Sequence, residues 1–458
     1  MTKVKDIIDE QKIFEILENT SHPMGEEILK ILDKALNKKG LSLEEVGYLL
    51  NSEDPILIEK MFEAARKIKW EIYGERLVFF APLYVSSFCV NDCEYCGFHR
   101  RNPTPRKKLT LQEVEEQVKI LEDMGHKRLL LEFGEHPIEN PIDYVVDVIK
   151  TIYRTKSGRG EIRRVNVNIA ATTVENYRKL KAAGIGTYQL FQETYHRETY
   201  EKLHNGPKAD YERQLFAHDR AFEAGIDDVG LGVLFGLYDW KFEVLALVSH
   251  AQYLDKKFGV GPHTFSVPRF QPAETVDWQP QYSVSEDELL RIIAILRLAV
   301  PYTGMIISTR ERPEIRAKAF EIGISQTSAA SRTSPGGYGK SEGLSQFSLQ
   351  DHRSLDEVLL SILEQKLLPS FCTACYRQER TGKAFMSLAK PGLIHNFCRP
   401  NAILTFKEYL EDYASEKTKE IGTAIIKKYL SQIPDNSIRQ ETESRLKRLE
   451  QGERDLYF

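Results

Sequence analysis

The stretch VFFAPLYVSSFCVNDCEYCGF, residues 78–98, joins a short apolar, β-rich run to three closely spaced cysteines. These are Cys89, Cys93 and Cys96, separated by three and then by two residues. A [4Fe–4S] cluster normally takes four thiolates, one per iron. Three thiolates leave one iron open to another ligand. The stretch therefore predicts a strand followed by a loop that holds a reactive metal cluster.

Seven further β-rich runs follow, separated by amphipathic stretches with helical periodicity. Eight strands alternating with helices over about 250 residues indicate a (βα)8 barrel, an α/β fold of the TIM type; a doubly wound open sheet is the alternative. In a barrel the loop after the first strand lies at the C-terminal mouth, where active sites are found. The other runs are RLLLEFG from Arg128, RVNVNIA from Arg164, TYQLFQE from Thr187, DVGLGVLFG from Asp228, HTFSVPRF from His263, MIISTR from Met305 and ISQTSA from Ile324.

Three segments are expected along the chain. Residues 1–75 form an N-terminal helical segment, residues 76–350 the barrel, and residues 351–458 a mostly helical C-terminal extension that carries a second metal site. Capping boxes mark several helix starts, because a Ser or Thr followed three residues later by Glu satisfies the first free amides. They are Ser42 with Glu45, Thr110 with Glu113, Thr172 with Glu175, Ser285 with Glu288, and Ser354 with Glu357.

Composition excludes several classes of protein. The 458 residues include 63 basic and 67 acidic side chains, a formal net charge of -4, so no nucleic-acid footprint is expected. No apolar run reaches the length of a membrane span, and the charged N-terminus does not read as a secretory signal. We therefore expect a cytoplasmic protein whose six cysteines bind metal and do not form disulfides.

The remaining three cysteines form a second triplet in the extension. Cys372 and Cys375 are separated by two residues, and Cys398 follows after 22 more. With His395 these residues match a structural Cys3His zinc site as well as an iron–sulfur site, and the spacing leaves both open. For the first triplet, zinc would need a fourth ligand such as His99.

The pattern C-x3-C-x-aromatic-C at Cys89 resembles the radical SAM (S-adenosylmethionine) superfamily. The resemblance implies that the open iron of a [4Fe–4S] cluster is chelated by S-adenosylmethionine, and that reduction yields a 5′-deoxyadenosyl radical. Tyr95 is then an aromatic that covers the cluster or stacks on a ligand.

The same resemblance implies further S-adenosylmethionine contacts. Gly134 and Glu135 are similar to the family's glycine–glutamate turn, although Phe133 stands where a second glycine is usual. Glu193 is similar to the acid that contacts the cofactor, and Arg213 to the arginine that binds the methionine carboxylate. Gly232, in VGLGVLFG, would let the backbone approach the adenine.

Within the superfamily the chain resembles the aromatic-amino-acid lyases. The matching stretches are FQETYH, SVPRFQP, ISTRERPEIR and SAASRTSPGGY, which begin at residues 191, 266, 307 and 328. The resemblance implies cleavage of the Cα–Cβ bond of L-tyrosine to p-cresol and dehydroglycine (2-iminoacetate). Arg310 is expected to bind the tyrosine carboxylate, with Arg312 as its competitor and Ser328 as a second contact.

The extension is similar to that of the tyrosine-cleaving maturases of [FeFe]-hydrogenase, which carry C-x2-C-x22-C. This implies that dehydroglycine is converted to carbon monoxide and cyanide, captured on an auxiliary [4Fe–4S] cluster with an additional iron, a [5Fe–5S] type, which also binds free cysteine. His263 is expected to ligate that iron. It begins the sixth strand, so the two clusters would face each other from opposite mouths. Expected partners are an electron donor such as ferredoxin or flavodoxin and other hydrogenase maturation proteins.

Three alternatives compete with this interpretation. A thiamine-pathway 2-iminoacetate synthase would stop at dehydroglycine, and the second triplet speaks against it. A biotin-synthase-like enzyme would need cluster ligands inside the barrel, yet no cysteine lies between Cys96 and Cys372. A non-catalytic iron–sulfur or zinc scaffold would need neither Glu193 nor Arg213.

Overall fold

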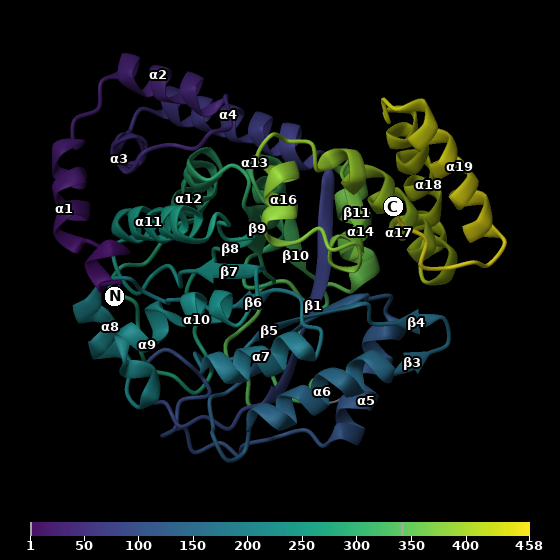
Figure 1. Ribbon diagram of the computed structural model, residues 1–458, viewed down its shortest axis with the longest axis horizontal. Coiled ribbons are helices and arrows are strands. Elements are labelled where there is room, and N and C mark those ends of the chain that lie inside the picture. The colour runs from purple at the N-terminus through teal and green to yellow at the C-terminus, as the bar shows by residue number, and fades with distance from the viewer. Residues whose placement is uncertain (1, 340–342) are drawn as a thin grey trace.

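A computed structural model describes residues 2–339 and 343–458 of the chain. In these residues eight parallel strands pair in sequence order, and the last pairs with the first, so the sheet closes into a barrel (Figure 1). The predicted (βα)8 barrel is confirmed, and the open-sheet alternative is wrong. The strands are β1 (Arg76–Ser86), β2 (Arg128–Phe133), β5 (Arg164–Asn168), β6 (Tyr188–Gln189), β7 (Val229–Gly232), β8 (Thr264–Ser266), β9 (Gly304–Ile307) and β10 (Gln326–Ser328).

The barrel strands are buried because helices cover them outside and side chains fill them inside. All eleven residues of β1 are buried, as are those of β7, β8, β9 and β10. Each of the eight predicted runs overlaps one strand of the barrel. The surrounding helices are α5 (Leu111–Asp123), α6 (Ile142–Arg154), α7 (Val174–Ala182), α8 (Arg197–Leu203), α9 (Tyr211–Leu215), α10 (Ala217–Glu223), α11 (Trp240–Phe258), α12 (Glu286–Ala299) and α13 (Pro313–Ile322).

Helix starts follow the predicted capping chemistry with one exception. The boxes at Ser42, Thr110, Ser285 and Ser354 are all formed. The box predicted at Thr172 is wrong by one residue, because α7 is capped by Thr173, whose hydroxyl accepts a hydrogen bond from the Asn176 amide. A short hairpin, β3 (Lys156–Ser157) with β4 (Gly160–Glu161), precedes β5.

The N-terminal segment is helical and packs on one side of the barrel. Its longest helix, α4, lies against α12 and α13, while α1 and α3 lie against α11 (Figure 1). The segment thus covers the later helices of the barrel, and it also contacts the loop after β6, where Phe14 packs against His196. Its elements are η1 (Val4–Asp6), α1 (Glu10–Asn19), α2 (Gly25–Ala35), α3 (Leu43–Asn51) and α4 (Pro55–Tyr73).

The C-terminal extension contains a strand that the sequence did not predict. Strand β11 runs parallel to the beginning of β1, with Arg76 opposite Leu368 and Val78 opposite Ser370. The chain after Ser370 therefore begins at the N-terminal mouth of the barrel. The elements are α14 (Leu355–Glu364), β11 (Leu368–Ser370), α15 (Ala374–Arg377), α16 (Gly382–Ala389), α17 (His395–Asp412), α18 (Glu416–Ser431) and α19 (Asn436–Glu450).

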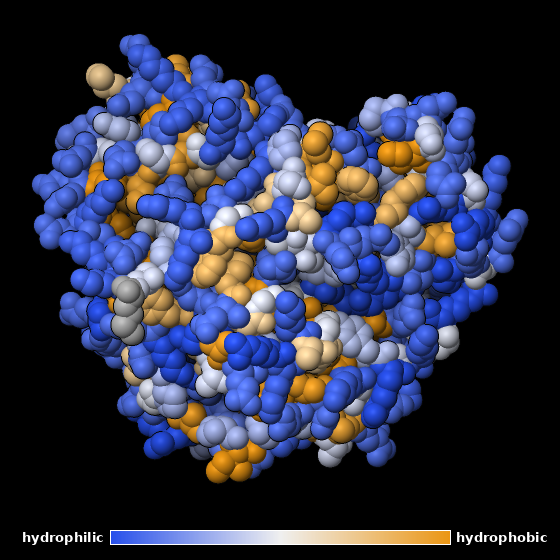
Figure 2. All heavy atoms as spheres, viewed as in Figure 1, coloured by the Kyte–Doolittle hydropathy of each residue, from blue (hydrophilic) through white to orange (hydrophobic). Residues whose placement is uncertain are grey.

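The visible surface is mostly hydrophilic, with apolar residues in scattered groups (Figure 2). Among the described residues, no helix combines the length and the apolar character needed to cross a bilayer.

Candidate active site and auxiliary metal site

The first cysteine triplet lies in the loop after β1, at the C-terminal mouth of the barrel. Other loops of this mouth fix it: the Val90 amide donates to the Glu135 carbonyl (2.7 Å), and the Gly97 amide donates to the Gln346 carbonyl (3.0 Å). The loop is therefore held by the segment after β2 and by the segment after β10. Such anchoring brings three thiols of one short loop to a fixed position.

The three thiols fit a metal cluster better than they fit free cysteines. Burial, with a smaller contribution from the neighbouring thiolates, raises the pKa of Cys93 well above its usual value and that of Cys96 to about 11. Without metal the thiols would stay protonated, whereas a cluster takes them as thiolates. His99, the suggested fourth zinc ligand, instead makes a hydrogen bond with Asp92 (3.1 Å between Nδ1 and Oδ1).

Four of the six predicted cofactor residues line one pocket beside the triplet; Arg213 and Gly232 are not among its lining residues. Glu135 and Glu193 line it with the three cysteines, Gly134 and Tyr95. Glu135 forms an ion pair with Arg213 (2.6 Å), so two predicted cofactor contacts pair with each other. Arg213 also donates to the carbonyls of Ala171 and Pro207.

Lys208 is a residue of this pocket that the sequence did not identify. Its ammonium forms an ion pair with Glu193 (2.7 Å). Burial alone would lower its pKa, but Glu193 and the Cys93 thiolate together raise it, so the lysine is charged beside the cluster loop. No family motif quoted above includes it, and a lysine in a glycine- and proline-containing loop gives no pattern of its own.

The backbone of Glu193 adopts a conformation that is rare for a residue with a side chain. Its φ is +69°, in the left-handed region. The Glu193 carbonyl accepts a hydrogen bond from the Leu234 amide (2.9 Å), which holds the residue beside the segment after β7. Strained backbone of this kind persists where surrounding structure enforces it, often at functional sites.

Two glycines and one tyrosine complete the predicted cofactor set. A Cβ on Gly134 would overlap the carbonyl of Phe88, directly before Cys89, so a glycine is needed for close packing. At Gly232 the neighbouring space is occupied by the Phe191 ring, which gives a reason for this glycine other than approach of an adenine. The Tyr95 hydroxyl is hydrogen-bonded to His204 (2.8 Å).

Replacing Gly134 with alanine should disturb the cluster loop. The overlap with the Phe88 carbonyl forces the backbone to move, and such overpacking typically costs about 1–3 kcal/mol. We expect a lower denaturation midpoint and less iron bound at the first triplet. Gly343→Ala is the matched control, since its Cβ would meet no atom of the described residues within 4 Å. Equal midpoints and iron contents for the two variants would contradict the tight packing.

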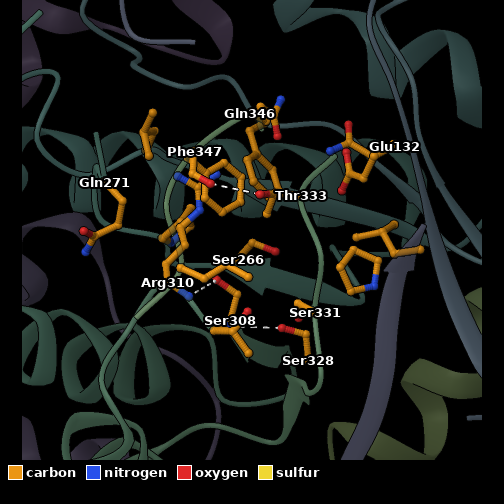
Figure 3. A pocket seen from close by; sticks show the side chains of 18 of the residues that line it. Glu132, Ser266, Gln271, Ser308, Arg310, Ser328, Ser331, Thr333, Gln346 and Phe347 are labelled. Carbon is orange, nitrogen blue, oxygen red and sulfur yellow. Dashed lines mark hydrogen bonds between the residues drawn. The ribbon is translucent and has the colours of Figure 1, made fainter. Parts of the chain in front are cut away.

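A second cavity continues from the cluster pocket into the barrel. Tyr95, Cys96, Glu132 and Glu193 line both spaces, so a ligand in the cavity would lie next to a ligand on the cluster. Figure 3 shows polar side chains from several strand ends pointing into it. Apolar walls with a few polar and charged groups are typical of a small-molecule site.

Arg310 and Ser328 both line this cavity. The Arg310 guanidinium stacks on the Phe347 ring (3.3 Å to the centroid), as Figure 3 shows, and among the described residues no group accepts a hydrogen bond from it. Arg312 lies at the surface, where it pairs with Glu286. Of the two arginines, therefore, Arg310 is placed to meet a carboxylate in the cavity.

The second cysteine triplet lies at the opposite mouth of the barrel. Cys372, Cys375 and Cys398 line one pocket together with His263, and the Cys372 carbonyl accepts a hydrogen bond from Arg128 at the start of β2 (3.0 Å). Burial, together with the thiolates of Cys398 and Cys372, raises the pKa of Cys375 to about 12. As at the first triplet, these buried thiols suit metal binding.

The two histidines near the second triplet differ in placement. His263 directly precedes β8, lies 3.7 Å from Asp228 and packs against Phe385, and burial lowers its pKa, which favours the neutral ring that binds metals. His395, the ligand of the zinc alternative, is hydrogen-bonded to the Gly392 carbonyl (2.6 Å).

The described residues contain no group of three His, Cys, Asp or Glu side chains arranged around a single metal ion. In an iron–sulfur cluster each thiolate binds a different iron, so its cysteines stand further apart than the ligands of one ion.

A barrel whose first loop carries a cysteine triplet, beside a pocket with polar groups for a cofactor, defines a radical SAM enzyme. The comparisons agree. Residues 83–247 match the Radical SAM superfamily, and residues 266–367 match the Biotin and Thiamin Synthesis associated domain. The 2-iminoacetate synthase of Salmonella typhimurium (strain LT2) is 33% identical over 341 residues, which are 74% of this chain and 89% of that protein.

Solved structures extend the likeness over nearly the full length. A crystal structure of HydG, a maturase of the [FeFe]-hydrogenase, is 58% identical with a TM-score of 0.96, covering 99% of this chain and 100% of the other. The structure of the maturase HydG from Carboxydothermus hydrogenoformans is 41% identical with a TM-score of 0.87, covering 97% and 100%. The chain belongs to the HydG family of the radical SAM superfamily.

Proposed function

We propose that this chain is a radical SAM lyase that cleaves the Cα–Cβ bond of L-tyrosine to p-cresol and dehydroglycine, for maturation of an [FeFe]-hydrogenase. The observation that carries the proposal is the cavity that shares its wall with the cluster pocket and contains Arg310. The 2-iminoacetate synthase and HydG relatives support the choice of substrate and pathway.

The cofactors are a [4Fe–4S] cluster and S-adenosylmethionine, which when bound supply a 5′-deoxyadenosyl radical. Cys89, Cys93 and Cys96 hold the cluster. Glu135, Glu193 and Arg213 present charged groups to the amino-acid part of the cofactor, and Tyr95 covers the site. The protein's part is to orient the reacting groups and to exclude water from them.

In the cavity, the Arg310 guanidinium binds the tyrosine carboxylate. A planar guanidinium matches a carboxylate with two parallel hydrogen bonds, and the Phe347 ring beneath it fixes the plane. Ser328, at the end of β10, supplies a hydroxyl to the same substrate. An electron donor such as ferredoxin or flavodoxin would reduce the cluster.

A second reaction, at the site of the second cysteine triplet, uses the dehydroglycine. We propose that dehydroglycine is converted to carbon monoxide and cyanide, which are collected on an additional iron at an auxiliary cluster held by Cys372, Cys375 and Cys398, with His263 and free cysteine on that iron. His263 and the three cysteines line one pocket, which supports this arrangement. The iron–carbonyl–cyanide product would pass to other hydrogenase maturation proteins.

The alternative is a 2-iminoacetate synthase that stops at dehydroglycine. The match to that relative covers 74% of this chain, and the chain carries a second cysteine triplet with its own pocket. This favours the longer reaction sequence.

The test is a product assay with tyrosine, S-adenosylmethionine and a reductant. We expect p-cresol and 5′-deoxyadenosine from the reconstituted protein and neither from Cys93→Ala. Metal analysis belongs to the same experiment. Zinc at the second triplet, or 5′-deoxyadenosine without p-cresol from the native protein, would overturn the proposal.

A further inference from the structure

Three carboxylates line the cluster pocket, and two of them have basic partners. Glu135 pairs with Arg213 and Glu193 pairs with Lys208. The third, Glu132 at the end of β2, has no Lys, Arg or His nitrogen within 4.0 Å among the described residues. Its hydrogen-bond partner is the neutral Asn168, and burial raises its pKa to about 8. A partly buried carboxylate without a cation is costly, so Glu132 is a site that a positively charged ligand group would stabilise.

Glu132 lies where the two spaces meet. On the barrel sheet it stands opposite Tyr84 of β1 and Asn168 of β5, and all three side chains face the cavity. Glu132 also lines the cluster pocket, whereas Arg310 lines the cavity only. A group bound to Glu132 would therefore lie beside the cluster pocket, and Figure 3 shows Arg310 on the other side of the cavity from Glu132.

The separation of Glu132 and Arg310 suits an α-amino acid. Arg310 lowers the pKa of Glu132, so the two charges interact across the cavity, yet they form no ion pair within 4.0 Å. An amino acid carries an ammonium and a carboxylate on one carbon atom. Placed between the two residues, it would give each of them an opposite charge to contact.

We propose that Glu132 binds the amino group of the substrate and holds it at the boundary with the cofactor pocket. The inference rests on the proposed function, in which tyrosine is the substrate and hydrogen is removed from its amino group. It assigns to Glu132 the orientation of tyrosine: amino group toward the cofactor, carboxylate toward Arg310. Asn168 positions the Glu132 carboxylate through its hydrogen bond.

Binding of three related ligands tests the assignment. Equilibrium dialysis would use the reconstituted holoenzyme with S-adenosylmethionine and no reductant. The ligands are tyrosine, tyramine, which lacks the carboxylate, and 3-(4-hydroxyphenyl)propanoate, which lacks the amine. For the native protein we expect loss of the amine to weaken binding by about 10- to 100-fold, the usual range for a charge-assisted hydrogen bond.

Two matched variants should respond to different ligands. Glu132→Gln should lose most of its preference for tyrosine over 3-(4-hydroxyphenyl)propanoate and keep its preference over tyramine. Arg310→Gln should lose most of its preference for tyrosine over tyramine and keep its preference over 3-(4-hydroxyphenyl)propanoate. In turnover, Glu132→Gln should raise KM for tyrosine and form more 5′-deoxyadenosine per p-cresol. Should Glu132→Gln fail to fold, Glu132→Asp keeps the charge and should keep the preference for the amine.

The outcomes separate the two proposals. If the native protein neither binds tyrosine nor forms p-cresol, the proposed function fails. If it does both and Glu132→Gln keeps the full preference for the amine, the Glu132 assignment alone is overturned. Loss of S-adenosylmethionine binding in Glu132→Gln would also overturn it, because Glu132 would then belong to the cofactor.

Discussion

Replacing Arg310 with glutamine should lower kcat/KM for p-cresol formation by at least about 100-fold. The substitution removes two charge-assisted hydrogen bonds to the substrate carboxylate, each worth about 1.5–3 kcal/mol, and each 1.4 kcal/mol is a factor of ten. The guanidinium is stacked on Phe347 and has no acceptor among the described residues, so the substitution breaks no ion pair of the protein. The effect should therefore appear in substrate use and not in stability.

Arg312→Gln is the control for that experiment. It removes an arginine two residues away that pairs with Glu286 at the surface, so kcat/KM should stay within about twofold of the native value. S-adenosylmethionine binding and iron content should be unchanged in both variants. Equal activities for the Arg310 and Arg312 variants would remove Arg310 from the substrate site.

Replacing His263 with alanine should separate the two halves of the reaction. His263 lies with the second triplet at the mouth opposite the first, so p-cresol release should remain within about twofold of the native rate. Loss of an imidazole ligand typically reduces metal affinity by tenfold or more, so assembly of the carbonylated iron product should fall by about that factor. Infrared bands of iron-bound carbon monoxide and cyanide measure assembly of the iron product, and a p-cresol assay on the same sample measures the lyase step.

His395→Ala provides the comparison at the same mouth. Its ring is hydrogen-bonded to the Gly392 carbonyl, and the proposed auxiliary site does not use it. It should therefore keep both activities. A result in which His395→Ala releases metal while His263→Ala has no effect would favour the Cys3His zinc site instead.

The barrel could be predicted because its sequence signals are local and repeated. Short apolar runs, capping residues and the cysteine spacing each depend on neighbours in the chain. Strand β11 could not be predicted, since Leu368–Ser370 is three residues long and contains a proline, and only pairing with the start of β1 makes it a strand. That strand places the second triplet at its mouth.

The site was predictable where a family motif exists and not elsewhere. Sequence motifs identified the six cysteines, Glu193 and Arg310. The structure gives the location of these residues, and their chemical roles remain predictions. Lys208 and Glu132 could not be predicted, because the role of each depends on residues distant in sequence. Lys208 pairs with Glu193, and Glu132 interacts with Asn168 and Arg310. One signal was present for Glu132, namely an acidic residue inside the apolar run RLLLEF.

The most direct test of a lyase with two separate sites follows carbon from labelled tyrosine in two proteins. These are the native chain and a variant with Cys372, Cys375 and Cys398 all replaced by alanine. The account predicts labelled p-cresol from both, and iron-bound labelled carbon monoxide and cyanide from the native chain only. Iron at the first triplet should be equal in both proteins. Loss of p-cresol from the variant with the first cluster intact, or iron-bound carbon monoxide and cyanide still formed by it, would contradict the account.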